Sequence, residues 1–171
     1  FISQTIDSTY NALDTAQFFD RFCEVFSRLM HTIKGAYSLV VSVAGFGTFA
    51  LRDPHGIRPL VMGVRKRSHG VDHMFASENT PFYSLGFECE GDVKAGEVVF
   101  ASCDGQLLRR QLVKETFRPC MFEYVYFARP DAMLDDISVY RARLRLGQNL
   151  AKRWVEAHPD LLPDVVIPVP S

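Results

Sequence analysis

The sequence has no long apolar run, no leader pattern and almost no net charge. No stretch approaches the ~20 consecutive apolar residues that a transmembrane helix requires, and no charged-then-apolar segment marks a secretory signal. Lys and Arg number 19 against 20 Asp and Glu, for a formal net charge of −1, and the basic residues are scattered. This pattern gives no electrostatic signal for nucleic acid. These absences favour a cytoplasmic protein that binds neither membranes nor nucleic acid.

Cysteine is scarce as well, and its spacing excludes the common cysteine motifs. The four cysteines are widely separated and form no Cys-x-x-Cys pair: Cys23, Cys89, Cys103 and Cys120. Free thiols in a reducing compartment are the expected state for such a pattern. No neighbouring base or helix start marks any of the four as a nucleophile.

What the chain does contain is enough apolar sequence for a globular core, since 47% of its 171 residues are hydrophobic. Asp14 or Thr15 can cap a helix over about 16–33, where apolar residues recur at helical spacing. Short β-rich segments joined by tight turns then favour antiparallel strands. We expect strands at 36–44, 47–52, 60–64 and 73–77, a short helix at 79–85, and a hairpin of 96–102 with 106–112 around Asp104-Gly105.

The last third of the sequence has a different texture. Residues 122–127 are predicted to form a strand with aromatics buried on both faces. Asp135 or Asp136 can open a helix over about 138–157. The apolar segment 164–170 is typical of a strand in a parallel sheet covered on both sides. Because such a strand needs neighbours, we expect this chain to be a piece of a longer protein.

The run 52–60, Arg-Asp-Pro-His-Gly-Ile-Arg-Pro-Leu, is the most informative local motif. A strand ends at the first two residues, and Gly56 can adopt the positive φ that a tight reversal needs. Arg52, Asp53 and Arg58 would then lie at the mouth of a hairpin, where a guanidinium can bind a carboxylate through two parallel hydrogen bonds. Physical reasoning alone therefore predicts a structural, salt-bridged hairpin.

Four motifs in this order resemble the amidophosphoribosyltransferases, the glutamine-dependent transferases that open purine synthesis. They are Gly-Ala-Tyr at 35–37, the run at 52–60, Ala-Ser-Glu at 76–78, and Phe-Glu-Tyr-Val-Tyr-Phe-Ala-Arg-Pro-Asp at 122–131. Arg-Asp-Pro and Ala-Ser-Glu also occur in other glutamine amidotransferases with an N-terminal nucleophile, which remain an alternative. The 122–131 run is specific to the one family and discriminates against them.

The resemblance implies an α+β fold. It implies the later half of an N-terminal-nucleophile glutaminase αββα sandwich (residues 1–132), followed by the start of an α/β phosphoribosyltransferase domain (133–171). The family nucleophile is the thiol of the first mature residue, and Phe1 has none. The family's substrate-gripping residues precede the matched region. We therefore expect no catalytic residue in this chain and no activity from it alone, which leaves a non-catalytic regulatory partner as a second alternative.

The resemblance also assigns residues at the interdomain junction. Tyr126, Arg129 and Asp131 match positions expected to couple the two active sites and line the ammonia path. Pro130 between opposite charges would fix the angle between the domains. A buried tyrosine with a satisfied hydroxyl is an equal alternative for Tyr126.

Cofactors and partners are likewise implied by the resemblance. Cys120 matches an iron–sulfur ligand of one branch, but a cluster needs four thiolates, so we expect a plain buried cysteine. Mg²⁺ would bind with phosphoribosyl pyrophosphate (PRPP) beyond residue 171. The full-length enzyme would use glutamine and PRPP and form a homo-oligomer.

Overall fold

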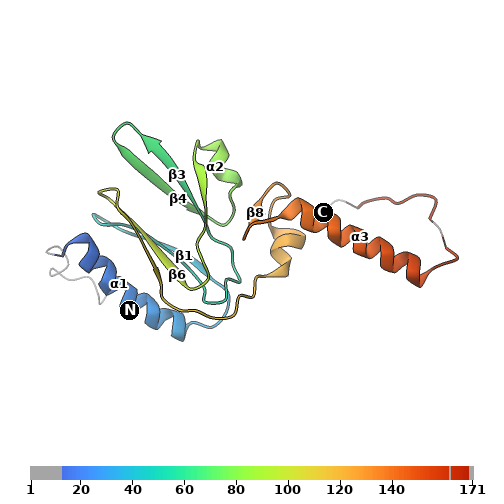
Figure 1. Ribbon diagram of the computed structural model, residues 1–171, viewed down its shortest axis with the longest axis horizontal. Helices are drawn as coiled ribbons and strands as arrows, with labels where there is room; N and C mark the ends of the chain where they lie inside the picture. The colour runs from blue at the N-terminus through green and yellow to red at the C-terminus, as the bar shows by residue number, and fades with distance from the viewer. Residues whose placement is uncertain (1–12, 162, 170–171) are drawn as a thin grey trace.

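The computed structural model describes residues 13–161 and 163–169. Its body begins with a helix, α1 (Thr15–Thr32), packed on a four-stranded antiparallel sheet (Figure 1). The strand order in this sheet is β1-β2-β6-β7. The strands are β1 (Ser38–Val43), β2 (Gly47–Arg52), β6 (Glu97–Ser102) and β7 (Leu107–Gln111). The predicted antiparallel pairing and the hairpin around Asp104-Gly105 are confirmed.

Helix α1 forms where its cap and apolar spacing predict it. The Asp14 carboxylate accepts a 2.7 Å hydrogen bond from the Gln17 amide, which satisfies one of the free N–H groups of the first turn. Below the cap, Phe18, Phe22 and Phe26 are buried against the sheet. They pack around Phe49 of β2, whose ring stacks on Phe100 of β6 at 4.3 Å.

A second antiparallel sheet, with order β4-β3-β5, covers the face of the first sheet that points away from α1 (Figure 1). Its strands are β3 (Val61–Arg67), β4 (Gly70–Ala76) and β5 (Glu88–Asp92). Apolar residues of both sheets, with one residue before β3 and one after β5, form the core between the sheets: Ala50, Leu60, Met62, Val93 and Val99. Strand β5 was not predicted, because its sequence Glu-Cys-Glu-Gly-Asp shows no apolar alternation.

The short helix α2 (Thr80–Ser84), predicted at 79–85, covers the other face of the second sheet. Strand alternation places Gly63 on the face of β3 opposite Met62. A Cβ at Gly63 would lie only 2.9 Å from the Phe82 ring, so the helix approaches the strand backbone there. The body therefore has four layers: helix, sheet, sheet and helix.

The prediction of a strand at 122–127 is wrong. This segment forms a π-helical turn, η3 (Glu123–Phe127), closed by a hydrogen bond from the Ala128 amide to the Glu123 carbonyl. Its carbonyls are bound by the Arg143 guanidinium rather than by a neighbouring strand. The aromatics are also not all buried, because Phe122, Tyr126 and Phe127 are exposed.

A short hairpin follows, with two residues in each strand: β8 (Met133–Leu134) and β9 (Ile137–Ser138). It leads directly into α3 (Val139–Ala157). Asp135 and Asp136 do not open the helix as predicted. They form the hairpin turn with φ angles of 47° and 61°, and Ser138 caps α3 through the Arg141 amide. Helix α3 projects away from the body (Figure 1).

A small core anchors this hairpin. Tyr124, Ala128, Ala132, Leu134 and Val139 pack together, so the cluster includes residues on both sides of the domain boundary predicted at 132/133.

The strand predicted at 164–170 is not formed by its described part. Residues 163–169 have no regular secondary structure and are exposed. No strand runs alongside them in the described chain, and Pro168 has no N–H to contribute. Residues 1–12, and with them Phe1, lie outside the described residues. Within those residues, no helix combines the length and apolarity needed to cross a bilayer.

Candidate functional site

The hairpin predicted at 52–60 is not formed, because β2 and β3 belong to different sheets and the turn at 53–58 carries the chain from one sheet to the other. This turn is built by the Asp53 carboxylate. It accepts hydrogen bonds from the amides of His55, Ile57 and Arg58 at 3.0–3.1 Å. Gly56 completes the reversal with φ 64°, and a Cβ there would lie 2.7 Å from the Phe117 ring. A side chain at position 56 would therefore be strained and crowded.

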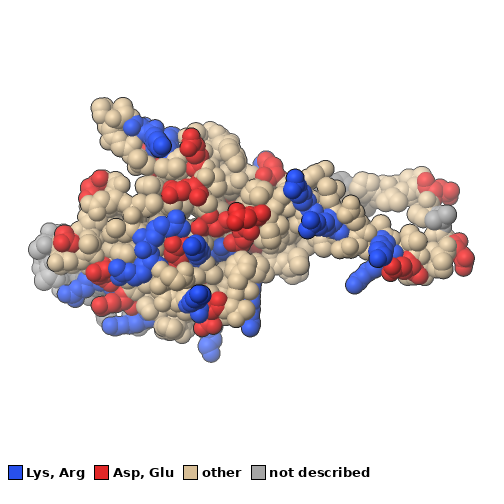
Figure 2. Space-filling model, viewed as in Figure 1, with Lys and Arg blue, Asp and Glu red and all other residues tan. Residues whose placement is uncertain are grey.

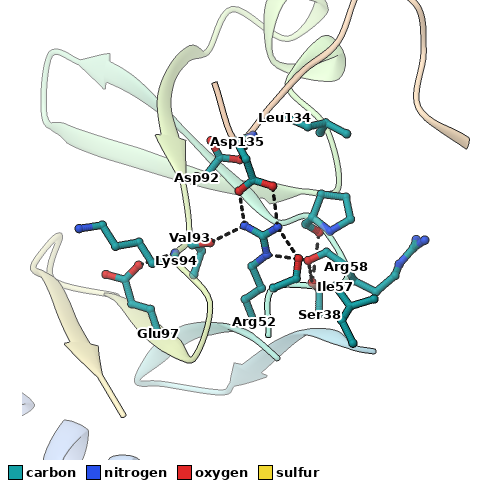
Figure 3. Close-up of polar contacts among 12 residues, drawn as sticks. Ser38, Arg52, Ile57, Arg58, Asp92, Val93, Lys94, Glu97, Leu134 and Asp135 are labelled. Carbon is teal, nitrogen blue, oxygen red and sulfur yellow. Dashed lines mark hydrogen bonds and ion pairs between the residues drawn. The ribbon is translucent and has the colours of Figure 1, made fainter. Parts of the chain in front are cut away.

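Arg52 is buried directly beneath this turn, with a side chain only 1% exposed (Figure 3). Its guanidinium makes five hydrogen bonds. Three go to the carbonyls of Gly56, Arg58 and Val93 at 2.7–3.1 Å. The other two go to the two oxygens of Asp135, at 2.7 and 2.9 Å. The five N–H groups of the arginine are thus all used.

The predicted guanidinium–carboxylate grip exists, but it does not form within the 52–60 run. Asp53 is already occupied by backbone amides, so Arg52 binds Asp135, 83 residues further along the chain. Arg58 instead forms an ion pair with Glu123, the first residue of η3. Nothing in the sequence around Asp135 marks it as this partner, because the contact depends on how the hairpin folds back onto the body.

A second carboxylate supports Asp135 from β5. The Asp92 side chain accepts a 3.2 Å hydrogen bond from the Asp135 amide. Burial raises the pKa of Asp92, while this hydrogen bond works in the opposite direction. A cavity of about 850 Å³ opens beside the cluster, and its walls carry charges of both signs, among them Glu90, Lys94, Arg109 and Asp136.

The Ala-Ser-Glu motif meets the 122–131 run where η3 and the β8–β9 hairpin contact the body, a region (residues 122–143) called the junction from here on. Glu78 accepts a 2.9 Å hydrogen bond from the Arg129 amide, and Asn79 accepts one of 3.0 Å from the Met133 amide. Together with the pair of Arg58 and Glu123, these bonds bring three of the four motifs singled out from the sequence into contact. Sequence reasoning missed Asn79 and Glu123 as junction residues.

Among the predicted coupling residues, Arg129 and Asp131 form a two-bond ion pair across Pro130, at 3.0 and 3.1 Å, with both side chains exposed. Tyr126 is 64% exposed and makes an edge contact with Phe127. It is therefore not a buried tyrosine in this chain. Its π-helical setting is of a kind often found at functional sites.

Cys120 is partly exposed, and its amide donates to the Ile57 carbonyl at 3.2 Å. Across the part of the chain that the structure describes, no three or more His, Cys, Asp or Glu side chains are grouped to hold a metal. The visible face of the molecule carries acidic and basic side chains interspersed (Figure 2).

Comparison with known proteins shows which proteins share this fold and sequence. No family model matches the chain. A solved structure of glutamine PRPP amidotransferase from B. subtilis, complexed with ADP and GMP, superimposes on 79% of the chain with a TM-score of 0.66 and 29% identity, and 28% of that structure is covered. The fold is accordingly that of a region of a PRPP amidotransferase.

Curated relatives identify the same group. The amidophosphoribosyltransferase of Pasteurella multocida is 44% identical over 156 residues, 86% of this chain, and that of Haemophilus influenzae is 46% identical over 144 residues, 81% of this chain. The chain spans only about 30% of the length of these relatives. The resemblance read from the sequence is confirmed: the chain is related to one region of the amidophosphoribosyltransferases.

Proposed function

We propose that this chain is part of an enzyme that makes 5-phosphoribosylamine. In the proposed reaction, water cleaves the glutamine amide to give glutamate and ammonia. The ammonia nitrogen then bonds to the sugar carbon of PRPP as pyrophosphate leaves. The identity of 44–46% with amidophosphoribosyltransferases over more than four fifths of the chain carries this proposal.

Within such an enzyme, the described residues would form the later part of the glutaminase domain and the entry to the transferase domain. The four layers of the body suit an αββα glutaminase sandwich, whose first sheet would be completed by strands from elsewhere in the protein. The thiol nucleophile and the PRPP site would also lie elsewhere, so the 171-residue chain by itself is expected to be inactive.

The junction would link the two half-reactions. Ammonia released in one domain must reach the other without escaping to water, so the relative position of the two domains matters to the yield. Tyr126, Arg129 and Asp131 lie on the segment that would join the two domains, and they would form part of this link. The complete enzyme is expected to bind Mg²⁺ with PRPP, to assemble as a homo-oligomer and to act in the cytoplasm.

The test uses the full-length protein that contains this sequence. With glutamine, PRPP and Mg²⁺, it should release glutamate and pyrophosphate in equal amounts, and pyrophosphate should also appear when ammonia replaces glutamine. Omission of PRPP provides the control for uncoupled glutamine hydrolysis. Glutamine hydrolysis that never consumes PRPP, even with ammonia supplied, would point to a different glutamine amidotransferase and contradict the proposal.

A further inference from the structure

The contacts of Arg52 join three segments that are distant in the sequence. The residue ends β2, and its guanidinium bonds to the turn after β2, to the connection after β5 and to the β8–β9 turn (Figure 3). Because its donors are all used and its side chain is 1% exposed, Arg52 has no freedom to follow a moving partner. The position of Asp135 is therefore fixed relative to the two sheets.

The β8–β9 turn needs this support. Asp135 and Asp136 both lie in the left-handed region, with φ angles of 47° and 61°, which disfavours residues other than glycine. Turns of this kind usually contain Asn-Gly or Asp-Gly. Here the body holds the conformation from outside, through the Arg52 guanidinium on the carboxylate and the Asp92 carboxylate on the Asp135 amide.

No flexible linker separates this turn from α3. Ser138 of β9 is the N-cap of the helix, and Val139 is fully buried in the small junction core. One turn later, the Arg143 guanidinium donates to the carbonyls of Tyr124, Tyr126 and Ala128. A shift of the β8–β9 turn would therefore move the start of α3 and, through Arg143, the backbone that carries Tyr126.

From these contacts we infer that Arg52 and Asp135 are a pair of positioning residues that set how the glutaminase part is oriented against the junction. The inference rests on the proposed function and deepens it. The pair touches no reacting atom in this view. It keeps the path between the two half-reactions aligned, so its loss should uncouple them rather than stop either one.

The test compares Asp135→Asn with wild type in the full-length protein. Asparagine keeps the shape of the side chain and tolerates the left-handed backbone, but it loses the charge and one of the two acceptors for Arg52. Asp72→Asn is the matched control, because the Asp72 carboxylate also binds arginines, Arg65 and Arg67, on the distant β3–β4 hairpin. Three rates are measured: glutamine hydrolysis, ammonia-dependent pyrophosphate release and glutamine-dependent pyrophosphate release.

For Asp135→Asn, we expect pyrophosphate formed per glutamine hydrolysed to fall at least about fivefold, since misplacement by an ångström is costly in such transfers. Glutamine hydrolysis and the ammonia-dependent rate should stay within about twofold, and Asp72→Asn should leave the ratio unchanged. An unchanged ratio in Asp135→Asn, or parallel loss of all three rates, overturns the inference. A wild-type protein that forms no phosphoribosylamine refutes the proposed function instead.

Hydrogen–deuterium exchange tests the positioning role without relying on activity. In Asp135→Asn, amides at 129–145 should exchange faster, while those of α1 and β2 should match wild type. A purely local effect at 134–136, or faster exchange throughout the body, would overturn the inference whatever the enzyme assays show. The variant Arg52→Lys, which cannot form the two-bond pair, should likewise speed exchange at 129–145. It should also speed exchange around 53–58 and Val93, where the bonds of the guanidinium to carbonyls are lost.

Discussion

The body and the junction of this molecule are held together by different forces. In the body, α1 and the first sheet bury a cluster of stacked aromatic rings, with Phe49 in contact with five other phenylalanines. In the junction, the apolar cluster is small, and three arginines tie the segments together. Arg52 and Arg143 bind backbone carbonyls, and Arg58 pairs with the Glu123 carboxylate.

This difference has consequences for how each region responds to change. Apolar burial is non-directional and grows with the area removed from water, so the body resists small shifts but loses much when volume is removed. Guanidinium bonds to carbonyls and carboxylates are directional, so the junction holds one geometry and loses it when a single donor goes. The body therefore supplies stability, while the junction supplies orientation.

The largest expected effect comes from Phe49→Ala in the body. Removal of this ring from the centre of the aromatic cluster should lower the free energy of unfolding by about 3–5 kcal/mol, since the surrounding rings can close the cavity only in part. Urea denaturation followed by circular dichroism measures the loss.

Val40→Ala on β1 is the matched control, because Val40 is 53% exposed. We expect it to change the free energy of unfolding by no more than about 0.5 kcal/mol. Equal costs for the two variants would show that the aromatic cluster does not dominate the stability of the body.

The same difference explains what the sequence could predict. Periodic apolar residues and a cap specify α1, and alternation with tight turns specifies the antiparallel strands, because these signals are local. The 122–127 segment has the aromatic, β-branched composition of a strand, yet it becomes η3. Its backbone is held by Arg143, and neither that contact nor the contact of Arg52 with Asp135 leaves a local pattern. The motif resemblance singled out the 122–131 segment, whereas the geometry of that segment required the structure.

A smaller effect is expected from Arg143→Met in the junction. Methionine keeps the helix propensity and most of the length but leaves three carbonyls without their charged donor, at a cost of about 1.5–3 kcal/mol. The loss should be local: hydrogen exchange should rise at 121–130 and in the first turns of α3, while α1 stays protected.

Arg145→Met, on the exposed part of the same helix, is the control, because within the described chain no hydrogen bond or ion pair ties Arg145 to η3. It should leave exchange at 121–130 unchanged. If Arg143→Met destabilises α1 as much as η3, the body and the junction unfold as one unit and the division between them is wrong.

The smallest and most diagnostic effect should come from Arg58→Met, because it depends on pH. Burial raises the pKa of Glu123, and Arg58 acts against that rise. Without Arg58 the pKa should rise further, so the folded state would bind a proton that the unfolded state releases. The stability of the variant relative to wild type should then fall as the pH rises from the glutamate pKa of the unfolded state towards the raised pKa of Glu123 in the folded variant. We expect a cost of about 1–2 kcal/mol at pH 7.5.

The pH profile separates this electrostatic cost from a loss of packing. Below the ordinary glutamate pKa of about 4.3, Glu123 is protonated in both states, and the electrostatic part of the penalty should vanish. The double variant Arg58→Met with Glu123→Gln removes the carboxylate, and its penalty should no longer vary with pH over that range. A penalty in Arg58→Met that stays constant from pH 4 to 7.5 would mean that Arg58 acts by packing against Phe127, whose ring centroid lies 5.9 Å from its guanidinium carbon. In that case apolar packing, which stabilises the body, would also hold this part of the junction.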